Sequence, residues 1–486
     1  MSPAGKERKA TKCYRVGRLL GAVLGLLVMT MFHAPSYSIS HGEARHLLAR
    51  TGFSLPRPAE LERIISLSRV EAVDFLLRRV NSSSATPVPY WIDELPPAYK
   101  LRKAWSSTQR QAFNTQNRQR LRELQSWWVT EMLHTKTPLT ENLVLFWHNH
   151  FTSSFQEVKW VPFLYRQNAL LRRHALGNFK LLLRSIVTDP AMLFFLDGRR
   201  NHTKQPNENF AREFFELFTL GEGNGYNETD IREAARAFSG WVMPPNSATA
   251  VFRSRRHDNG LKTILGKTGN FGADDVVSIV MGDPRLSAYI AEKFFTAYIG
   301  GKSNRAEIQK LARVFRRSGY KIRALFRATL LSDAFWDQAR RGIIIKTPSD
   351  TVIGVARLVF WQRDTKILVK AMKSMGQELF RPPNVKGWPG GATWITTASL
   401  SARNRFTARL LRDLGTMRGR KANKNMVMAS MKKDPFLEMA MGPNMDSDRL
   451  TAIMLAVAPV QNFSSHSAPP TARLSALVQD PAFQMK

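Results

Sequence analysis

The sequence predicts a mainly α-helical protein, a multi-helix globular assembly with one short β-hairpin or extended segment near 250–265. Apolar residues recur with helical spacing, most clearly over 210–218 and 231–238. Helix-start signals also recur, as where Asp189 supplies a capping side chain directly before Pro190. Strand-like sequence is scarce. With 43% hydrophobic residues, the chain can bury a substantial core.

Changes in composition and stretches rich in proline and glycine divide the chain into five expected segments. These are a signal peptide or N-terminal anchor at 1–38, a helical N-terminal region at 40–245, a hairpin or loop connection at 246–269, a helical C-terminal region at 270–412, and a Met/Lys-rich peripheral tail at 413–486. Thr347 and Pro348 repeat the helix-start signal within the C-terminal region. Within the connection, 250–253 is expected to pair with 262–265.

The N-terminus has the pattern of an export signal. Six basic residues precede an apolar run at 19–32, which is short for a membrane span of ~20 residues but typical of a signal-peptide core. Small residues favour cleavage after Ser38, and the alternative is an uncleaved anchor at 19–32 that holds the protein at the membrane. Cys13, the single cysteine, lies within this segment. We therefore expect a periplasmic or extracellular protein without disulfides.

The chain is strongly basic. Its formal charge is +34, and loss of 1–38 would lower the charge by five, to +29. A field of this sign attracts polyanions. For an exported chain, the expected partners are an anionic polysaccharide or another envelope component, or a partner protein, whereas nucleic acid is a less natural partner there. The alternative is that the charges are scattered and only aid solubility.

The segment 206–241 reads as helix, glycine-rich turn, helix. On the first helix, Glu208, Arg212 and Glu216 share one side, and on the second, Arg232 and Arg236 share one side. Helices joined by a short turn tend to pack antiparallel. We therefore expect these polar faces to meet each other and the segment 148–150 in one buried network, which would be either an ion-pair lattice or a functional centre.

The tripeptide His148-Asn149-His150 invites a metal-site interpretation. If one helix runs through it, however, the two histidines point to different sides and cannot both bind one ion. Hydrogen-bonded core histidines are the alternative. Trp388 and Trp394 lie in a loop rich in proline and glycine, where they either present flat faces to a sugar ring or fix the loop to the core.

Carboxylates and a histidine supply candidates for acid/base chemistry. The candidate catalytic residues are Glu208, Glu213, His257 and Asp258, and the candidate binding residues are Arg212, Arg232, Arg236, His148, His150, Trp388 and Trp394. Oxygen-bearing residues around the glycine turn could hold a divalent cation such as calcium, but Asn227 as N-cap with Asp230 three residues later explains them more simply. The common serine-hydrolase and zinc-protease signatures are absent from the sequence.

Several motifs together resemble one known family. They are FWHNHFTSS at 146–154, GNFKLLL at 177–183, DPAMLFFLD at 189–197, HDNGLKTILG at 257–266 and PPNVKGWPGGATWI at 382–395, in addition to the segment 206–241. In this order, over roughly 41–406, they resemble the bacterial domain-of-unknown-function family 1800. The resemblance implies an exported, largely helical bacterial protein. It implies no activity and supplies no catalytic residues.

Two functional hypotheses follow from the sequence. The first is a binding or assembly module for an anionic envelope polymer or a partner protein, which rests on the basic charge. The second is a hydrolase that acts on an envelope or extracellular polymer through the carboxylate and histidine candidates. Whether the protein is an enzyme, and which cofactor it would use, the sequence leaves open.

We expect the protein to be recovered from the cell envelope or the medium without 1–38, because the basic and apolar N-terminus is typical of a cleaved export signal. Fractionation followed by N-terminal sequencing checks this. Recovery of a cytoplasmic protein that still begins at Met1 would contradict export, and an envelope protein that begins at Met1 would indicate the anchor.

Overall fold

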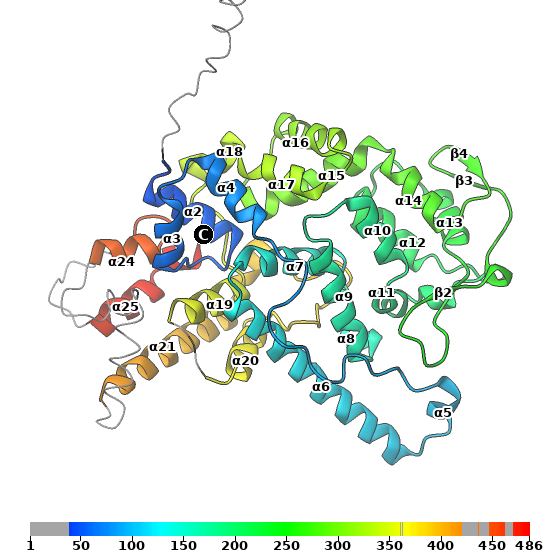
Figure 1. The fold of residues 1–486 in the computed structure, drawn as a ribbon, viewed down its shortest axis with the longest axis horizontal. Coiled ribbons are helices and arrows are strands. Elements are labelled where there is room, and N and C mark those ends of the chain that lie inside the picture. The colour runs from blue at the N-terminus through cyan, green and yellow to red at the C-terminus, as the bar shows by residue number, and fades with distance from the viewer. Residues whose placement is uncertain (1–37, 360, 362, 420–435, 437–446, 462–469) are drawn as a thin grey trace, which may run out of the picture. The chain divides into compact units, whose positions relative to one another are not determined.

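The computed structural model describes residues 38–359, 361, 363–419, 436, 447–461 and 470–486. The predicted signal or anchor at 1–37 and parts of the predicted tail lie outside these residues. The mainly α fold is confirmed, because helices connected by loops make up most of the described chain (Figure 1). None of the described helices is long and apolar enough to cross a membrane.

The elements follow one another in three groups. The first group comprises α2 (His41–Thr51), α3 (Pro58–Ile64), α4 (Arg69–Arg78), α5 (Tyr99–Lys103), α6 (Ser107–His134), α7 (Pro138–His150), α8 (Phe155–Val158), α9 (Val161–Arg173), α10 (Phe179–Val187) and α11 (Pro190–Phe195). The second comprises η1 (Gly198–Arg200), α12 (Asn209–Glu213), η2 (Phe214–Thr219), α13 (Glu228–Ala237), β1 (Trp241–Val242), β2 (Val251–Phe252), η3 (Ser254–Arg256), β3 (Lys262–Ile264) and β4 (Lys267–Gly269).

The third group contains the helices that follow the strands. They are α14 (Ala273–Met281), α15 (Pro284–Phe294), η4 (Phe295–Ile299), α16 (Arg305–Arg317), α17 (Ile322–Leu330), α18 (Asp333–Trp336), η5 (Gln338–Arg340), α19 (Pro348–Leu358), α20 (Lys366–Ser374), η6 (Gly391–Trp394), α21 (Thr397–Gly419), α24 (Ser447–Met454), α25 (Pro470–Gln479) and η8 (Pro481–Gln484).

Capping side chains determine where many of these helices begin. Asp189 caps α11 with Pro190 in the first turn, and Thr347 caps α19, both as predicted. The serines before α2, α4 and α6 each accept a hydrogen bond from the backbone N–H three residues later. Such a cap contributes about 1 kcal/mol, because it satisfies an N–H that the helix itself leaves without a partner.

β2 and β3 occur where strands were expected, but they pair with β1 and β4, which were not predicted. β2 pairs antiparallel with β1, and β3 pairs with β4. Leu265 and Gly266 connect β3 to β4 with φ angles of 47° and 75°. A two-residue turn with positive φ at both positions reverses the chain at once. The residues 262–264 therefore pair with the segment that follows them, and the predicted pairing with 250–253 is wrong.

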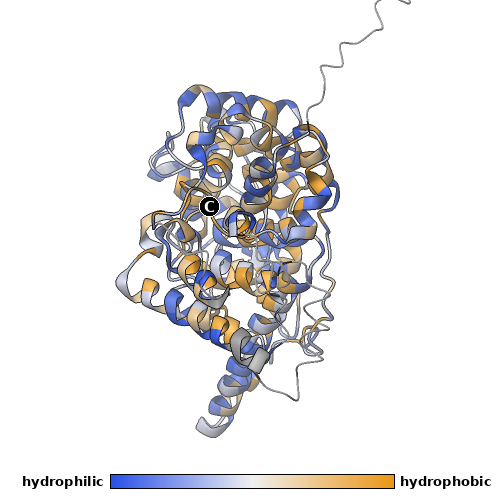
Figure 2. Cartoon of the chain, turned by 90° about the vertical axis from the view of Figure 1, so that its left-hand side faces the viewer, coloured by the Kyte–Doolittle hydropathy of each residue, from blue (hydrophilic) through white to orange (hydrophobic). Residues whose placement is uncertain are grey.

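One continuous apolar core holds the helices together. Its buried residues extend along the chain from Ile39 to Phe483. In Figure 2, apolar and polar residues alternate along most helices, as expected for helices that bury one side. The residues Ile39–Lys486 form one compact unit, and the boundaries predicted inside it remain predictions.

The described part of the predicted tail contributes to this core. α25 packs against α21 and α24, and Leu450, Ile453 and Leu474 are buried. Backbone hydrogen bonds join Ile344 and Lys486 in both directions. Spacing alone did not indicate this burial, because α24 and α25 are short and are separated by sequence without helical periodicity.

A buried ion pair connects three helices inside the core. Arg172 of α9 donates two hydrogen bonds to Glu141 of α7, at 2.8 and 2.7 Å, and both side chains are at most 1% exposed. The Glu141 carboxylate also accepts from the indole N–H of Trp128 on α6, at 2.7 Å. Burial disfavours the Arg172 cation, but the adjacent Glu141 outweighs burial and raises the pKa of Arg172.

We expect Arg172→Met to lower the free energy of unfolding by about 3–5 kcal/mol, because it leaves the Glu141 carboxylate buried without its cation. Arg166→Met on the same helix is the matched control. Its pair with Asp93 is exposed, so its loss should cost less than about 1 kcal/mol. Urea denaturation of both variants measures the difference. Equal losses in the two variants would contradict a structural role specific to the buried pair.

Candidate functional site

The predicted helix–turn–helix at 206–241 is present, with one unpredicted feature. α12 continues directly into η2, which is a π-helix, and α13 packs against α12. Within η2 the hydroxyl of Thr219 donates to the carbonyl of Phe214 at 2.5 Å. Asn227 caps α13 together with Asp230, as predicted. A π-turn of this kind is frequent at functional sites, and no sequence signal marked it.

The first polar cluster centres on Arg212. Its guanidinium lies 2.7 Å from Glu228, 3.4 Å from Glu208 and 3.6 Å from Glu216. The hydrogen bonds that Arg212 donates to Glu228 are the main cause that raises the pKa of Arg212. These side chains are partly exposed, so each pair contributes little to stability. The cluster fixes the start of α13 beside α12.

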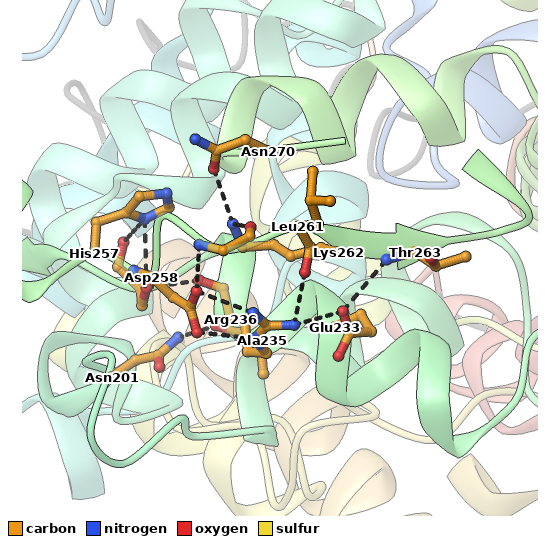
Figure 3. A network of polar contacts seen from close by, with 12 residues as sticks. Asn201, Glu233, Ala235, Arg236, His257, Asp258, Leu261, Lys262, Thr263 and Asn270 are labelled. Atoms are coloured by element: carbon orange, nitrogen blue, oxygen red, sulfur yellow. Dashed lines mark hydrogen bonds and ion pairs between the residues drawn. The ribbon is translucent and has the colours of Figure 1, made fainter. Parts of the chain in front are cut away.

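The second polar cluster centres on Arg236 and joins α13 to the loop before β3 (Figure 3). Arg236 donates to both carboxylate oxygens of Asp258, at 2.8 and 3.0 Å, and to Glu233 at 2.7 Å. The bond from Arg236 lowers the pKa of Asp258 to about 2. The ring Nδ1 of His257 lies 3.0 Å from the carbonyl oxygen of Ser239. Through these contacts, His257 and Asp258 hold the loop before β3 in position.

The expectation of one buried network across both helices is wrong. Arg236 faces β3 rather than the first helix, and Arg232 is exposed and donates to Thr229. Among the described contacts, neither arginine meets Glu208 or Glu216. Glu213 is half-buried, and burial raises its pKa, as does the nearby Glu216 carboxylate. The reason is that α13 turns its polar side toward the β3–β4 hairpin.

The two histidines lie on different sides of α7, because the helix continues through both. Nε2 of His150 lies 3.1 Å from the carbonyl oxygen of Phe218, and this acceptor places the proton on Nε2. Burial, together with the charge of Lys293, lowers the pKa of His150 to about 3, so the ring is neutral. Among the described residues, no group of three or more His, Cys, Asp or Glu is arranged to hold a metal.

His148 is enclosed by aromatic rings. The ring centroids of Trp128, Phe380 and Trp388 lie 5.5–5.6 Å from its own. Burial lowers its pKa to about 4. His148 is therefore a neutral core residue that contacts the loop containing Trp388.

Asn149 fixes that loop. Its side-chain oxygen accepts from the backbone N–H of Trp388 at 2.7 Å. Gly387 has a φ of +84° and packs directly on Asn149. Trp388 and Trp394 are each only 5% exposed. Both tryptophans thus fix the irregular loop to the core, and neither presents an open face to a sugar ring.

The loop and α7 form one wall of a cleft of about 660 Å³. Asn149 and His150 line it from α7, Trp388 from the loop, and Tyr289 and Lys293 from α15. A volume of this size is typical of small-ligand sites. Two of the motifs singled out in the sequence, FWHNHF and the Pro/Gly/Trp loop, therefore meet at one surface hollow.

Four basic and two acidic side chains line this cleft among neutral polar ones. Arg50 is buried and donates to the carbonyl oxygens of Ile299 and Arg340 at 3.1 and 2.6 Å. Lys486, also buried, is neutralised by Asp350 at 2.7 Å. In the part of the chain that the structure describes, Lys293 has no carboxylate within ion-pair distance. Its ammonium lies 4.9 Å from the centre of the Tyr289 ring, and partial burial lowers its pKa.

None of the four catalytic candidates, Glu208, Glu213, His257 and Asp258, lines this cleft. Conversely, sequence reasoning did not identify Arg50, Lys293 or Asp350 as site residues. No local signal distinguishes Arg50 or Lys293 from other basic residues. They meet because helices far apart in the sequence pack together.

The match to a family model covers residues 46–485 and carries the description "Protein of unknown function (DUF1800)". The chain belongs to this family. Neither the curated proteins nor the solved structures give a match. Membership confirms the resemblance seen in the motifs, and it leaves the activity of this DUF1800 protein to be argued from its own geometry.

We expect Gly387→Ala to displace the loop and to lower the free energy of unfolding by about 1–3 kcal/mol. The new Cβ would lie 2.7 Å from the backbone oxygen of Asn149, at a φ that alanine adopts only with strain. Gly390→Ala in the same loop is the control, because its Cβ meets no atom within 4 Å. Thermal unfolding and tryptophan fluorescence measure both variants, and a loss in the control as large as in Gly387→Ala would refute the packing argument.

Proposed function

We propose that this DUF1800 protein is an exported envelope binding module whose cleft holds the acidic group of an envelope component, a carboxylate or a phosphate. The observation that carries the proposal is the ammonium of Lys293, which lines the cleft without a carboxylate partner in the described chain. Lys293 is an exposed residue, and the low-dielectric walls of a cleft focus the field of its ammonium and so strengthen its attraction for an anion.

The other charged groups around the cleft leave its potential positive. Lys486 and Asp350 neutralise each other, and the buried Arg50 is bonded to carbonyl oxygens, which leave its positive charge in place. Lys386 pairs with Glu222 at 3.0 Å, but both side chains are more than 60% exposed, so an entering anion can compete for the lysine. Glu292 beside Lys293 is the acidic group that opposes this potential.

Neutral hydrogen-bonding groups complete the lining. His150 stays neutral, and its proton lies on Nε2, which leaves Nδ1 as an acceptor. The hydroxyl of Tyr289 donates to the carbonyl of Leu217 at 2.9 Å. This lining suits binding and orientation of a polar ligand. The envelope location rests on the basic and apolar N-terminus.

We do not propose the hydrolase, because no observation favours it. That alternative requires its carboxylates and His257 to share an open site. Instead, Asp258 is bonded to Arg236, Glu208 is paired with Arg212, and His257 contacts Ser239. Of the catalytic candidates, only Glu213 has a raised pKa and no described ion pair, and one carboxylate does not make an acid/base pair.

We expect the protein to bind glucuronic acid or glucose 1-phosphate but not glucose, and Lys293→Gln to weaken the binding at least about tenfold, because it removes a charge-assisted hydrogen bond. The two acids distinguish carboxylate from phosphate recognition. Lys310→Gln, an exposed lysine on the neighbouring α16, is the matched control and should bind as the unaltered protein does. Titration calorimetry measures each of the three sugars against the unaltered protein and both variants.

Equal binding of glucose and the two acids would contradict the proposal. So would an equal loss in the Lys293 and Lys310 variants, because that result would place the effect in the overall charge rather than in the cleft.

A further inference from the structure

A second surface feature, a groove along α6, lies apart from the residues that line the cleft. Three adjoining hollows of about 240, 550 and 690 Å³ follow this helix, and all three are lined by Asn114. Residues from Ser107 to Ser126 contribute to the lining, which corresponds to about 29 Å of helix. α6 lies next to α8, α9 and α20 (Figure 1). The groove is therefore long enough for an extended ligand.

The lining of the groove is almost purely cationic. Nine basic residues and one acidic residue, Glu378, line the three hollows. Glu378 is already bonded to Lys373 and Arg381, at 3.0 and 3.2 Å. The local sequence also carries charge of only one sign, because 95–122 contains seven basic residues and no acidic one.

Most of these cations lack a carboxylate partner, unlike their neighbours. Among the described ion pairs, none involves the groove residues Arg102, Arg110, Arg118, Arg122, Lys159 and Lys370. By contrast, Arg120 on the same helix does not line the groove and contacts Glu94 at 2.6 Å. The ion pairs within the groove are confined to Lys366, Lys373 and Arg381, and the other six cations have none among those described. Unpaired cations at this density repel one another, and a bound polyanion would relieve that repulsion.

One end of the groove adds aromatic surface. Trp105 and Phe113, both partly exposed, line the smallest hollow with a centroid distance of 4.9 Å, and the buried Trp160 supports the Phe113 ring at 5.8 Å. Arg102 and Arg110 line the same hollow. A flat ring face bordered by arginines suits a ligand unit that has one apolar face and an acidic substituent.

We infer that this groove binds an extended acidic polysaccharide of the polyuronate class. The length of the lining excludes a single small anion as a match, and a hollowed groove does not fit the flat surface of a membrane. A carboxylate on successive sugar units would meet successive unpaired cations along α6, and a sugar face would lie against the aromatic end. The groove is lined by residues that do not line the cleft, so this inference can be tested independently of the proposed function.

The test measures binding of the full chain to polygalacturonic acid, to neutral dextran, and to a single-stranded oligodeoxythymidylate, at several salt concentrations. The groove variant is Arg118→Gln with Lys370→Gln, two exposed cations on α6 and α20. The control is Arg313→Gln with Arg317→Gln, which removes the same charge from exposed positions on α16. Because all four positions are exposed, both variants should fold.

We expect polygalacturonic acid to bind in a salt-dependent way, dextran not to bind, and the groove variant to bind roughly twentyfold more weakly, about fivefold for each cation. The control variant should stay within about twofold. Equal losses in the two variants would overturn the inference, because the attraction would then come from the charge of the whole chain. Tighter binding of the oligonucleotide than of the polyuronate would overturn the ligand class.

Discussion

The buried pair of Arg172 and Glu141 is the interaction on which the central part of the structure depends. It joins α7 and α9, and the indole of Trp128 adds α6 to the same carboxylate. A carboxylate in an apolar core is tolerated only with its cation and its hydrogen bonds, so the three helices can pack in few ways. The ring of Trp128 then contacts His148, which extends this constraint to the next turns of α7.

From that fixed point, the spacing along α7 places the cleft residues. Glu141 and His148 are seven residues apart and lie on the core side, whereas Asn142 and Asn149, also seven apart, lie on the side that lines the cleft. Asn142 donates to the carbonyl of Gly52 and accepts from the hydroxyl of Tyr298. Asn149 holds the loop at Trp388. One helix therefore connects the ion pair of the core to both sides of the cleft.

The sequence could predict the structural features that depend on residues close together in the chain. Caps such as Asp189 and Asn227 follow from local spacing and were confirmed, and the helix that runs through His150 is one of the arrangements that the sequence left open. The partner of β3 was not predictable from alternation, because the turn at Leu265 and Gly266 decided it. The orientation of α13 and the position of Lys293 depend on packing between distant segments, which periodicity on one helix does not contain.

The positions of the basic side chains in the structure show why net charge alone was a weak guide to function. Part of the excess is structural. Arg357 is buried and donates to the carbonyl oxygens of Met132, Leu133 and Thr135, which lie at the end of α6. Arg45, also buried, donates to the carbonyl oxygens of Ile453 and Met454 at the end of α24. Such arginines satisfy carbonyls that a helix end leaves without partners, and they attract little from solution. The argument for a polyanion ligand therefore rests on where the exposed cations gather, and nine basic residues of the described chain line a groove whose single acid is already paired.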